Sequence, residues 1–236
     1  MKLRVPWKRS RLHPALQRNH HRFERIDRNQ PIESFDFVSL DTELTGLNPR
    51  TDAIVSIGAV RIRGLRIAAG ETFYSYVQPQ RSMPKISTLI HRITPGQVED
   101  APMLRDVLPD LLEYLGPALM VGHYVDLDMS FLNRASNRLL GGTLKNPCVD
   151  SMKLAQAYEQ RKRQSYYDKF NAGLGYNLGA LSKQYDLPVF QEHDALCDAF
   201  QAACLFIFLV KRLQAQGCRT LKDLYTASRA AQGFIG

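Results

Sequence analysis

Apolar residues recur along this chain with two spacings, and their order predicts an α/β fold. Short apolar runs bounded by turn residues predict strands, whereas apolar residues three and four positions apart predict helices. The predicted strands lie near 35–41, 53–63, 70–77, 118–122 and 146–149. The predicted helices lie near 103–115, around Asp128, and near 151–160, 177–185, 194–213 and 220–230.

Short connections separate the first three predicted strands, as in the sequence Arg-Gly-Leu-Arg-Ile-Ala-Ala-Gly at 63–70. Parallel neighbours need a long crossover, so these three strands predict an antiparallel meander. The later strands alternate with helices, which is typical of parallel pairing. Together they predict one mixed sheet.

The composition favours a globular enzyme. With 236 residues and 44% apolar content, the chain can build one sizeable core, in one domain or two. No apolar run approaches the roughly 20 residues that span a bilayer, and the N-terminus lacks a secretory apolar region. Four cysteines without a Cys-x-x-Cys pair indicate reduced thiols. We therefore expect a cytoplasmic protein without a membrane partner.

Positive charge is concentrated at the N-terminus. The net charge is +8, and residues 1–34 carry nine Lys or Arg against three acidic residues. We expect these residues to form a basic N-terminal extension. It could attract phosphate groups or dock a partner, or it could be a solvated extension with neither role.

A second basic stretch combines cations with aromatic rings. Such rings can stack on bases while cations follow the backbone of a single strand. A plain surface loop between two helices is the alternative. The residues concerned are Arg161, Lys162, Arg163, Tyr166, Tyr167, Lys169 and Phe170.

Two carboxylates stand one residue apart at the end of the first predicted strand. Asp41 and Glu43 project to the same side, because successive strand side chains alternate between faces. Two acidic groups so placed repel each other unless a cation lies between them. The pair therefore indicates a metal site, although acidic residues also occur at strand ends without one.

Asp128 lies on the buried stripe of an amphipathic helix, three and four residues before Phe131 and Leu132. A carboxylate in such a position is a candidate for function. Asp126 falls instead on the polar side, and we expect it to cap the helix or to favour its dipole.

A third acidic site precedes a strongly apolar helix. Asp198 stands at the head of that helix, with Ala202 and Leu205 at helical spacing below it. His193 is five residues earlier, which on a regular helix is another face, so we place it in the preceding loop. The alternative is that His193 and Asp194 merely begin the helix.

The sequences Asp-Thr-Glu at 41–43, Gly-His-Tyr-Val-Asp-Leu-Asp at 122–128 and His-Asp-Ala-Leu-Cys-Asp at 193–198 occur in this order. They resemble the three motifs of the DEDDh 3′-to-5′ exonucleases, above all the proofreading (epsilon) subunit of bacterial DNA polymerase III and its stand-alone relatives. The resemblance runs from about Phe35 to Val210 and implies an exonuclease domain over 35–236. It also implies a ribonuclease H-like five-stranded mixed sheet with helices on both faces.

The resemblance assigns a role to each candidate residue. It implies that two divalent cations, Mg²⁺ or Mn²⁺, are held by four carboxylates, and that His193 is the general base. It further implies substrate contacts from four residues, one of which is also a metal ligand. The metal ligands are Asp41, Glu43, Asp128 and Asp198, and the substrate contacts are Glu43, Thr45, Leu47 and His91.

The chemistry of phosphodiester hydrolysis needs these residue types. Hard carboxylate oxygens suit Mg²⁺ or Mn²⁺, and a His near its ordinary pKa can accept a proton from water. We expect release of 5′-mononucleotides from the 3′ end of single-stranded DNA, with polymerase association as a further possibility. RNA 3′-end trimming and a non-catalytic polymerase-associated binding subunit are the alternatives.

Overall fold

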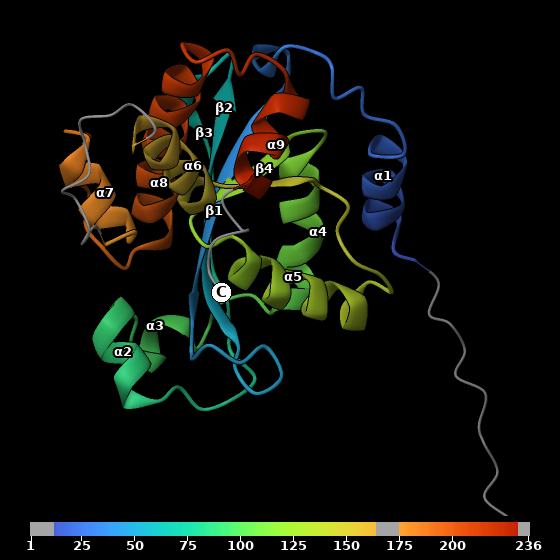
Figure 1. Cartoon of the computed structure of the whole chain (residues 1–236). Coiled ribbons are helices and arrows are strands. Elements are labelled where there is room, and N and C mark those ends of the chain that lie inside the picture. Colours follow the sequence, from blue (N-terminus) through green and yellow to red (C-terminus); the bar gives the residue numbers. More distant parts are fainter. Residues whose placement is uncertain (1–11, 164–174, 231–236) are drawn as a thin grey trace, which may run out of the picture.

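A five-stranded mixed sheet forms the centre of the molecule, in the order β3-β2-β1-β4-β5 (Figure 1). The computed structural model describes residues 12–163 and 175–230. β1 pairs with β2, and β2 with β3, in antiparallel fashion, whereas β4 is parallel to both β1 and β5. The strands are β1 Phe37–Leu44, β2 Ile54–Arg63, β3 Arg66–Tyr76, β4 Leu119–Gly122 and β5 Cys148–Asp150. The predicted fold class is confirmed.

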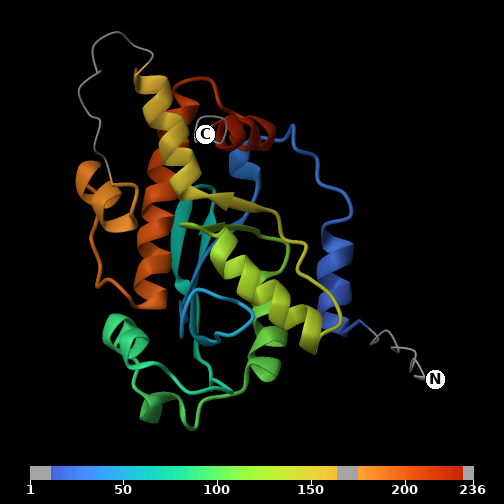
Figure 2. The same ribbon diagram turned by 60° about the horizontal axis from the view of Figure 1, so that its bottom comes forward.

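Helices cover both faces of the sheet, and each face has its own apolar core (Figure 2). On one face α1, α4 and α5 pack against even-numbered side chains of β1, such as Val38 and Leu40. On the other face α6, α8 and α9 pack around Phe37. The helices are α1 Pro14–Arg22, η1 Ile32–Ser34, α2 Lys85–His91, α3 Pro95–Val98, α4 Leu104–Leu115, α5 Asp126–Leu139, α6 Ser151–Arg163, α7 Leu178–Gln184, α8 Ala195–Gln214 and α9 Leu221–Ala230.

Two strands extend beyond their predicted bounds. β1 does not end near residue 41, because its pairing with β2 continues to Leu44; Asp41 therefore lies inside the strand. β3 begins at Arg66, because Gly64 and Leu65, both with positive φ, complete the turn in two residues. The prediction that residues 63–70 connect the two strands was therefore wrong for residues 66–70, which belong to β3.

The sequence pattern did not predict α1, which lies within the basic segment 1–34. Ala15 and Leu16 are buried against the core, and α1 contacts α4. The side-chain amide of buried Asn19 donates a hydrogen bond of 2.5 Å to the side-chain oxygen of Asn146. The described part of this segment thus includes a helix that packs on the main body.

Most of the basic and aromatic stretch lies outside the described residues, including Tyr166, Tyr167, Lys169 and Phe170. Within the described part of the chain, no helix combines the length and the apolar character needed to cross a membrane.

Candidate active site

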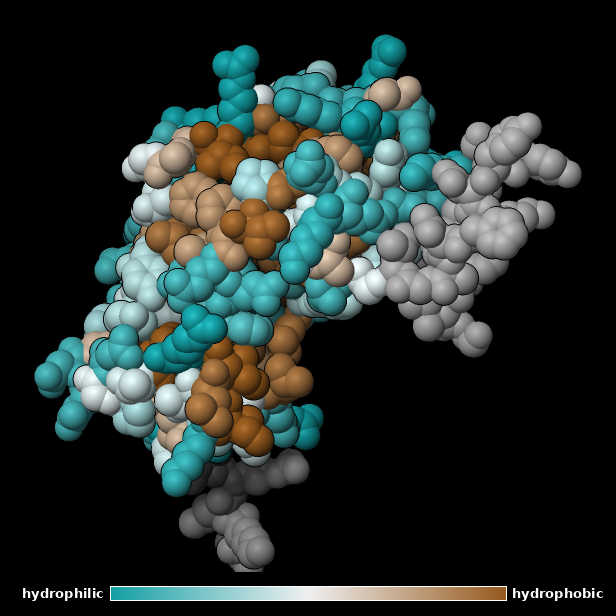
Figure 3. All heavy atoms as spheres, turned by 90° about the vertical axis from the view of Figure 1, so that its left-hand side faces the viewer, coloured by the Kyte–Doolittle hydropathy of each residue, from teal (hydrophilic) through white to brown (hydrophobic). Residues whose placement is uncertain are grey.

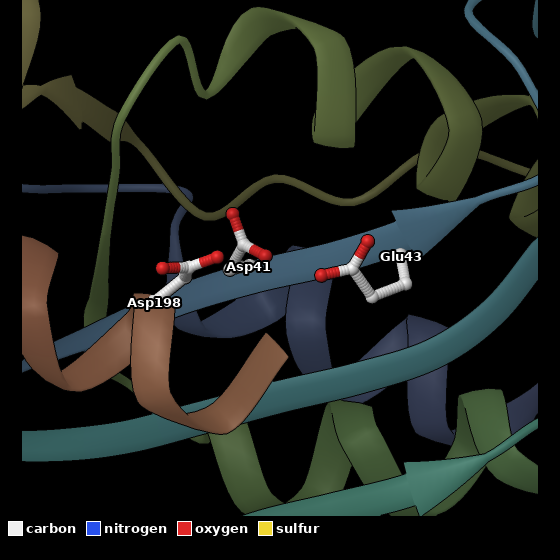
Figure 4. Close-up of side chains that lie close together, drawn as sticks. All are labelled: Asp41, Glu43 and Asp198. Carbon is white, nitrogen blue, oxygen red and sulfur yellow. The ribbon is translucent and has the colours of Figure 1, made fainter. Parts of the chain in front are cut away.

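Strand β1 places two carboxylates on the face of the sheet that α8 covers. Asp41 and Glu43 share this face, whereas Thr42 points to the other. One carboxylate oxygen from each of Asp41, Glu43 and Asp198 lies within 4.8 Å of the other two. Figure 4 shows the three side chains turned toward one another, two from β1 and one from α8. The structure therefore brings three of the four predicted metal ligands together.

The loop before α8 is held in place by a helix cap. The Asp194 side chain accepts hydrogen bonds from the backbone N–H groups of Leu196 and Cys197, at 3.1 and 2.9 Å. The backbone N–H of His193 donates a hydrogen bond of 2.9 Å to the carboxylate of Asp198. Asp194 therefore begins the helix, and His193 lies in the loop before it, as expected.

Asp198 reaches β1 because the first turn of α8 lies directly against β2. Gly58 is the β2 residue that pairs with Asp41. A Cβ atom on Gly58 would collide with the backbone of Ala195 and Leu196. The missing side chain therefore lets the head of α8 approach the sheet.

Asp128 approaches from the open edge of β1. β4 pairs with β1 only as far as Ser39, and α5 begins shortly after β4 ends. The Thr42 hydroxyl donates a hydrogen bond of 2.5 Å to the buried carboxylate of Asp128. Asp128 is outside the group of three within 4.8 Å, yet close enough for its charge to act on Asp41.

Asp126 does not cap α5, contrary to one expectation. It is the first residue of the helix, and the N-cap position is Val125. Its exposed carboxylate pairs instead with the ammonium group of Lys153 at 2.6 Å. As an acidic residue in the first turn, it still has a favourable interaction with the helix dipole.

Burial raises the pKa of every carboxyl group in this set. Burial, followed by the charges of Asp128 and Asp198, holds the pKa of Asp41 well above its ordinary value. Burial raises the pKa of Glu43 to about 7, to which the charge of Asp198 contributes. Burial raises the pKa of Asp128 to about 7 against the hydrogen bond from Thr42, and that of Asp198 to about 6.

This set of donors fits a divalent cation. Asp41, Glu43 and Asp198 supply only oxygen atoms, the ligands that Mg²⁺ and Mn²⁺ prefer. A positive charge between them would offset the repulsion that contributes to their raised pKa values. The carboxylate cluster thus agrees with the metal dependence that the sequence predicted.

Two histidines from distant parts of the chain lie close enough for their charges to interact, and one of them, His193, is next to Asp198. His193 is exposed, with a backbone φ of 65°. His91 ends α2, and its Nδ1 accepts a hydrogen bond of 3.0 Å from the N–H of Ile93. Its buried Nε2 has no hydrogen-bond partner among the described residues. Burial, and secondarily the proximity of His193, lowers the pKa of His91.

The loop after β1 carries the other two predicted substrate contacts. The Thr45 backbone N–H donates to the carbonyl of Ala53, and its hydroxyl accepts from the N–H of Ala53, both at 2.9 Å. This pairing closes the loop and buries Thr45. Leu47, at the tip of the loop, is 76% exposed, so its apolar side chain is accessible to a ligand.

Tyr74 and Tyr76 flank the carboxylates and were not singled out from the sequence. Tyr74 pairs with Gly58 and Tyr76 with Ser56, so both lie on the face of Asp41. Their rings are 5.3 Å apart in an edge-to-face arrangement. Burial is the first cause of the raised pKa of Tyr74, Tyr76 is the second, and the charges of Asp194 and Glu43 add to it. Alternating tyrosines in a predicted strand were the available signal.

An apolar patch lies on α2, next to the histidine that ends the helix. Ile86, Leu89 and Ile90 are 73, 77 and 50% exposed. Figure 3 shows apolar side chains gathered on the lower part of this face of the molecule, where α2 lies. The helix that carries His91 therefore presents its apolar residues outward.

A mixed five-stranded sheet with carboxylates from β1 and α8 clustered at its first strand is consistent with a nuclease. The chain matches the RNase_T family of exonucleases over residues 38–206 and belongs to that family. The family predicted from the three motifs is confirmed.

Curated relatives agree with this assignment. The DNA polymerase III subunit epsilon-like protein of Rhodobacter capsulatus is 34% identical over 202 residues, which cover 84% of this chain and 27% of the relative. The PolC-type DNA polymerase III of Caldanaerobacter subterraneus is 32% identical over 189 residues, covering 80% of this chain and 12% of the relative. The chain thus spans only a minor part of the relatives it matches.

Solved structures that match this fold include two exonucleases. Exonuclease X in complex with 5′ overhanging duplex DNA is 26% identical, with a TM-score of 0.59, and the match covers 81% of this chain and 99% of that one. Exonuclease I of Escherichia coli, in complex with a dT13 oligonucleotide, is 17% identical, with a TM-score of 0.66 over 78% of this chain and 42% of that one. At this identity, the second match shows the fold alone.

Proposed function

We propose that this protein is a metal-dependent exonuclease that removes 5′-mononucleotides from the 3′ end of single-stranded DNA. The observation that carries the proposal is the group of three carboxylates within 4.8 Å, beside a fourth at Asp128. Four carboxylates are the ligand set that two Mg²⁺ or Mn²⁺ ions need for phosphodiester hydrolysis. The domain proposed to contain this activity is 35–236, in the cytoplasm.

Each residue of the site has a distinct task in this proposal. Asp41, Glu43, Asp128 and Asp198 would hold the cations. When bound, divalent cations lower the pKa of water and stabilise the charge on the leaving oxygen. His193, exposed beside Asp198, would accept a proton from the attacking water while the water oxygen bonds to phosphorus and the bond from phosphorus to the 3′ oxygen of the preceding nucleotide breaks.

The groups around the carboxylates suit the end of a strand. His91 can donate from Nε2, because its Nδ1 already accepts a hydrogen bond. Leu47 can lie against the terminal base, while Thr45 holds the loop. The structure matched at 26% identity contains a DNA duplex with a 5′ overhang, which supports DNA as the substrate.

Two alternatives differ in what they predict. RNA 3′-end trimming uses the same ligands and differs only in the sugar. A non-catalytic polymerase-associated subunit would bind nucleic acid without cutting it. We include this alternative because two relatives are named as a DNA polymerase III and as an epsilon-like protein of that polymerase. Binding to a DNA polymerase is compatible with catalysis, and the proposal includes a polymerase only as a possible partner.

The test is hydrolysis of 3′-labelled single-stranded DNA, RNA and mismatched duplex in the presence of Mg²⁺ or Mn²⁺. Asp41→Asn and Asp198→Asn should each lower kcat by about a thousandfold or more, which corresponds to about 4 kcal/mol of barrier. Asp110→Asn, at an exposed position of α4, is the matched control and should be neutral. Wild-type rates in either site variant would overturn the proposal, and faster cleavage of RNA would favour the trimming alternative.

A further inference from the structure

A cavity outside the carboxylate site lies between the loop after β1, the end of β3 and α5. Its volume is about 130 Å³. Its floor is apolar and includes the buried side chains of Ile54, Val77 and Phe131. None of the carboxylate or histidine residues proposed for catalysis lines it.

Arginine side chains dominate the rim of this cavity. All five are exposed, and the only acidic residue of the lining, Asp52, accepts a hydrogen bond from the backbone N–H of Asn48. The arginines of the rim are Arg50, Arg81, Arg105, Arg134 and Arg138. The rim therefore carries a large excess of positive charge.

Most of this charge is not neutralised within the described part of the chain. The guanidinium groups of Arg81 and Arg138 bond only to neutral oxygens, of Thr51 at 2.8 Å and Gln80 at 3.2 Å. Arg105 faces Asp106 at 3.7 Å. For the guanidinium groups of Arg50 and Arg134, neither an ion pair nor a hydrogen bond is found among residues 12–163 and 175–230.

The cavity shares two elements with the carboxylate site. Helix α5 carries Asp128 in its first turn and leads to Arg134 and Arg138, about 9 and 15 Å further along its axis. The loop that exposes Leu47 contributes Arg50 to the rim. Figures 1 and 2 show this loop beside α5. A ligand bound at the carboxylates can therefore continue into the arginine rim.

We propose that the arginine rim binds the sugar-phosphate backbone of the nucleic acid substrate, away from the reacting 3′ end. This inference rests on the proposed function. Guanidinium groups form paired hydrogen bonds with phosphate oxygens, and five of them around an apolar floor suit a chain of phosphates. At about 3.4 Å per nucleotide in duplex geometry, the rim lies about three to four nucleotides from the reacting end.

The bound backbone can belong to the digested strand or to its complement. Both present the same phosphodiester groups, and single-stranded and duplex ligands distinguish them. If the digested strand contacts the rim, substitution of the arginines should weaken the binding of both ligands. If only the complement contacts it, the substitution should weaken only the binding of duplex with a recessed 3′ end. If the rim instead binds an acidic segment of a protein, replacing its arginines should leave the binding of both nucleic acid ligands unchanged.

The experiment compares the full chain with an Arg134→Glu/Arg138→Glu variant. Binding of fluorescein-labelled oligonucleotides is measured in EDTA, so that no cleavage occurs. At about 50 mM salt, the variant should bind a strand of about twelve nucleotides at least about tenfold more weakly. The slope of log affinity against log salt should fall by about 1.4 for a single strand, or about 1.8 for a duplex. Dinucleotide binding should change far less, because a dinucleotide cannot reach the rim.

A matched control has the same change of charge elsewhere. Lys211→Glu/Lys222→Glu alters exposed residues of α8 and α9, at the other end of the molecule in Figure 1. Melting temperatures of both variants establish that they fold. Equal weakening in the two variants, or an unchanged salt slope for both ligands, would overturn the proposal.

The proposed function can fail independently of this inference. If the rim binds nucleic acid but the protein is no nuclease, the salt slope still falls while wild type releases no product with Mn²⁺. If the protein is a nuclease without this contact, Mn²⁺-dependent cleavage is intact and the slopes coincide.

Discussion

His193 has a backbone conformation that few residues other than glycine adopt. Its φ of 65° lies in the left-handed region, and its N–H bonds to the carboxylate of Asp198. The side chain is exposed and lies near His91. A residue kept in a strained conformation next to a charged cluster is consistent with a role in the reaction.

Substitution of His193 should separate a general base from a metal ligand. His193→Asn retains a residue that tolerates positive φ, so the loop should be preserved. We expect kcat to fall by about a hundredfold or more, with residual activity rising with pH as hydroxide replaces the base. Rates measured between acidic and alkaline pH, together with Mn²⁺ affinity by calorimetry, provide the check.

The control for this substitution is His21→Asn, at an exposed position of α1. It should leave both rate and pH profile as in wild type. A loss of Mn²⁺ affinity in His193→Asn equal to that in Asp198→Asn would place His193 among the metal ligands.

Individual site residues could be predicted where local periodicity was sufficient. Strand alternation put Asp41 and Glu43 on one face, and helical spacing put Asp128 on a buried stripe. Alternation put Tyr74 and Tyr76 on one face of a strand, but it could not place Tyr74 beside Asp41. That position depends on the register between β2 and β3, which shifts at Val60.

The first turn of α8 depends on a single glycine. Gly58→Ala would place a methyl group inside the backbone of Ala195 and Leu196. The helix should move outward, at a typical overpacking cost of about 1–3 kcal/mol, and carry Asp198 away from β1. We expect weaker Mn²⁺ binding and a kcat reduced more than the melting temperature alone explains.

Gly70→Ala provides the comparison on the neighbouring strand. A Cβ atom on Gly70 has no atom within 4 Å, so this variant should be close to neutral. Normal Mn²⁺ affinity in Gly58→Ala would show that the helix has room to adjust without moving Asp198.

Helices were predictable when their apolar residues faced a core. α5 and α8 follow that rule, and the bounds predicted for α8, 194–213, lie close to the observed Ala195–Gln214. α1 buries only Ala15, Leu16 and Asn19, so its pattern was too weak. α2 turns Ile86 and Leu89 to solvent, and a pattern that assumes burial does not detect such a helix.

The metal-free protein should lose stability as pH rises. Folding raises the pKa of Glu43 and Asp128 to about 7 and that of Asp198 to about 6, from ordinary values of 4.5 and 3.8. Groups with raised pKa favour the folded state when protonated, so their contribution is present below about pH 4 and lost as pH rises through 6 to 7. Melting temperatures in EDTA should therefore decline across this range.

Saturating Mn²⁺ should reverse that decline, because a ligand that binds only the folded state stabilises it. The gain should be larger above pH 7 than near pH 5 and should largely vanish in Asp41→Ala/Asp128→Ala. Equal melting temperatures with and without Mn²⁺ at alkaline pH would mean that no preformed metal site exists.

The segment that leads into β1 and the segment that follows α8 lie side by side. Backbone hydrogen bonds join residues 28–32 to residues 219–222, among them one of 3.1 Å from Ile32 to Arg219. Figure 1 shows this region at the opposite end of the sheet from α2. Such a unit can be spliced into a longer polypeptide through two adjacent connections without disturbing its chemistry. This modularity gives a physical reason why a fold of this size can form a small fraction of a polymerase of the PolC type.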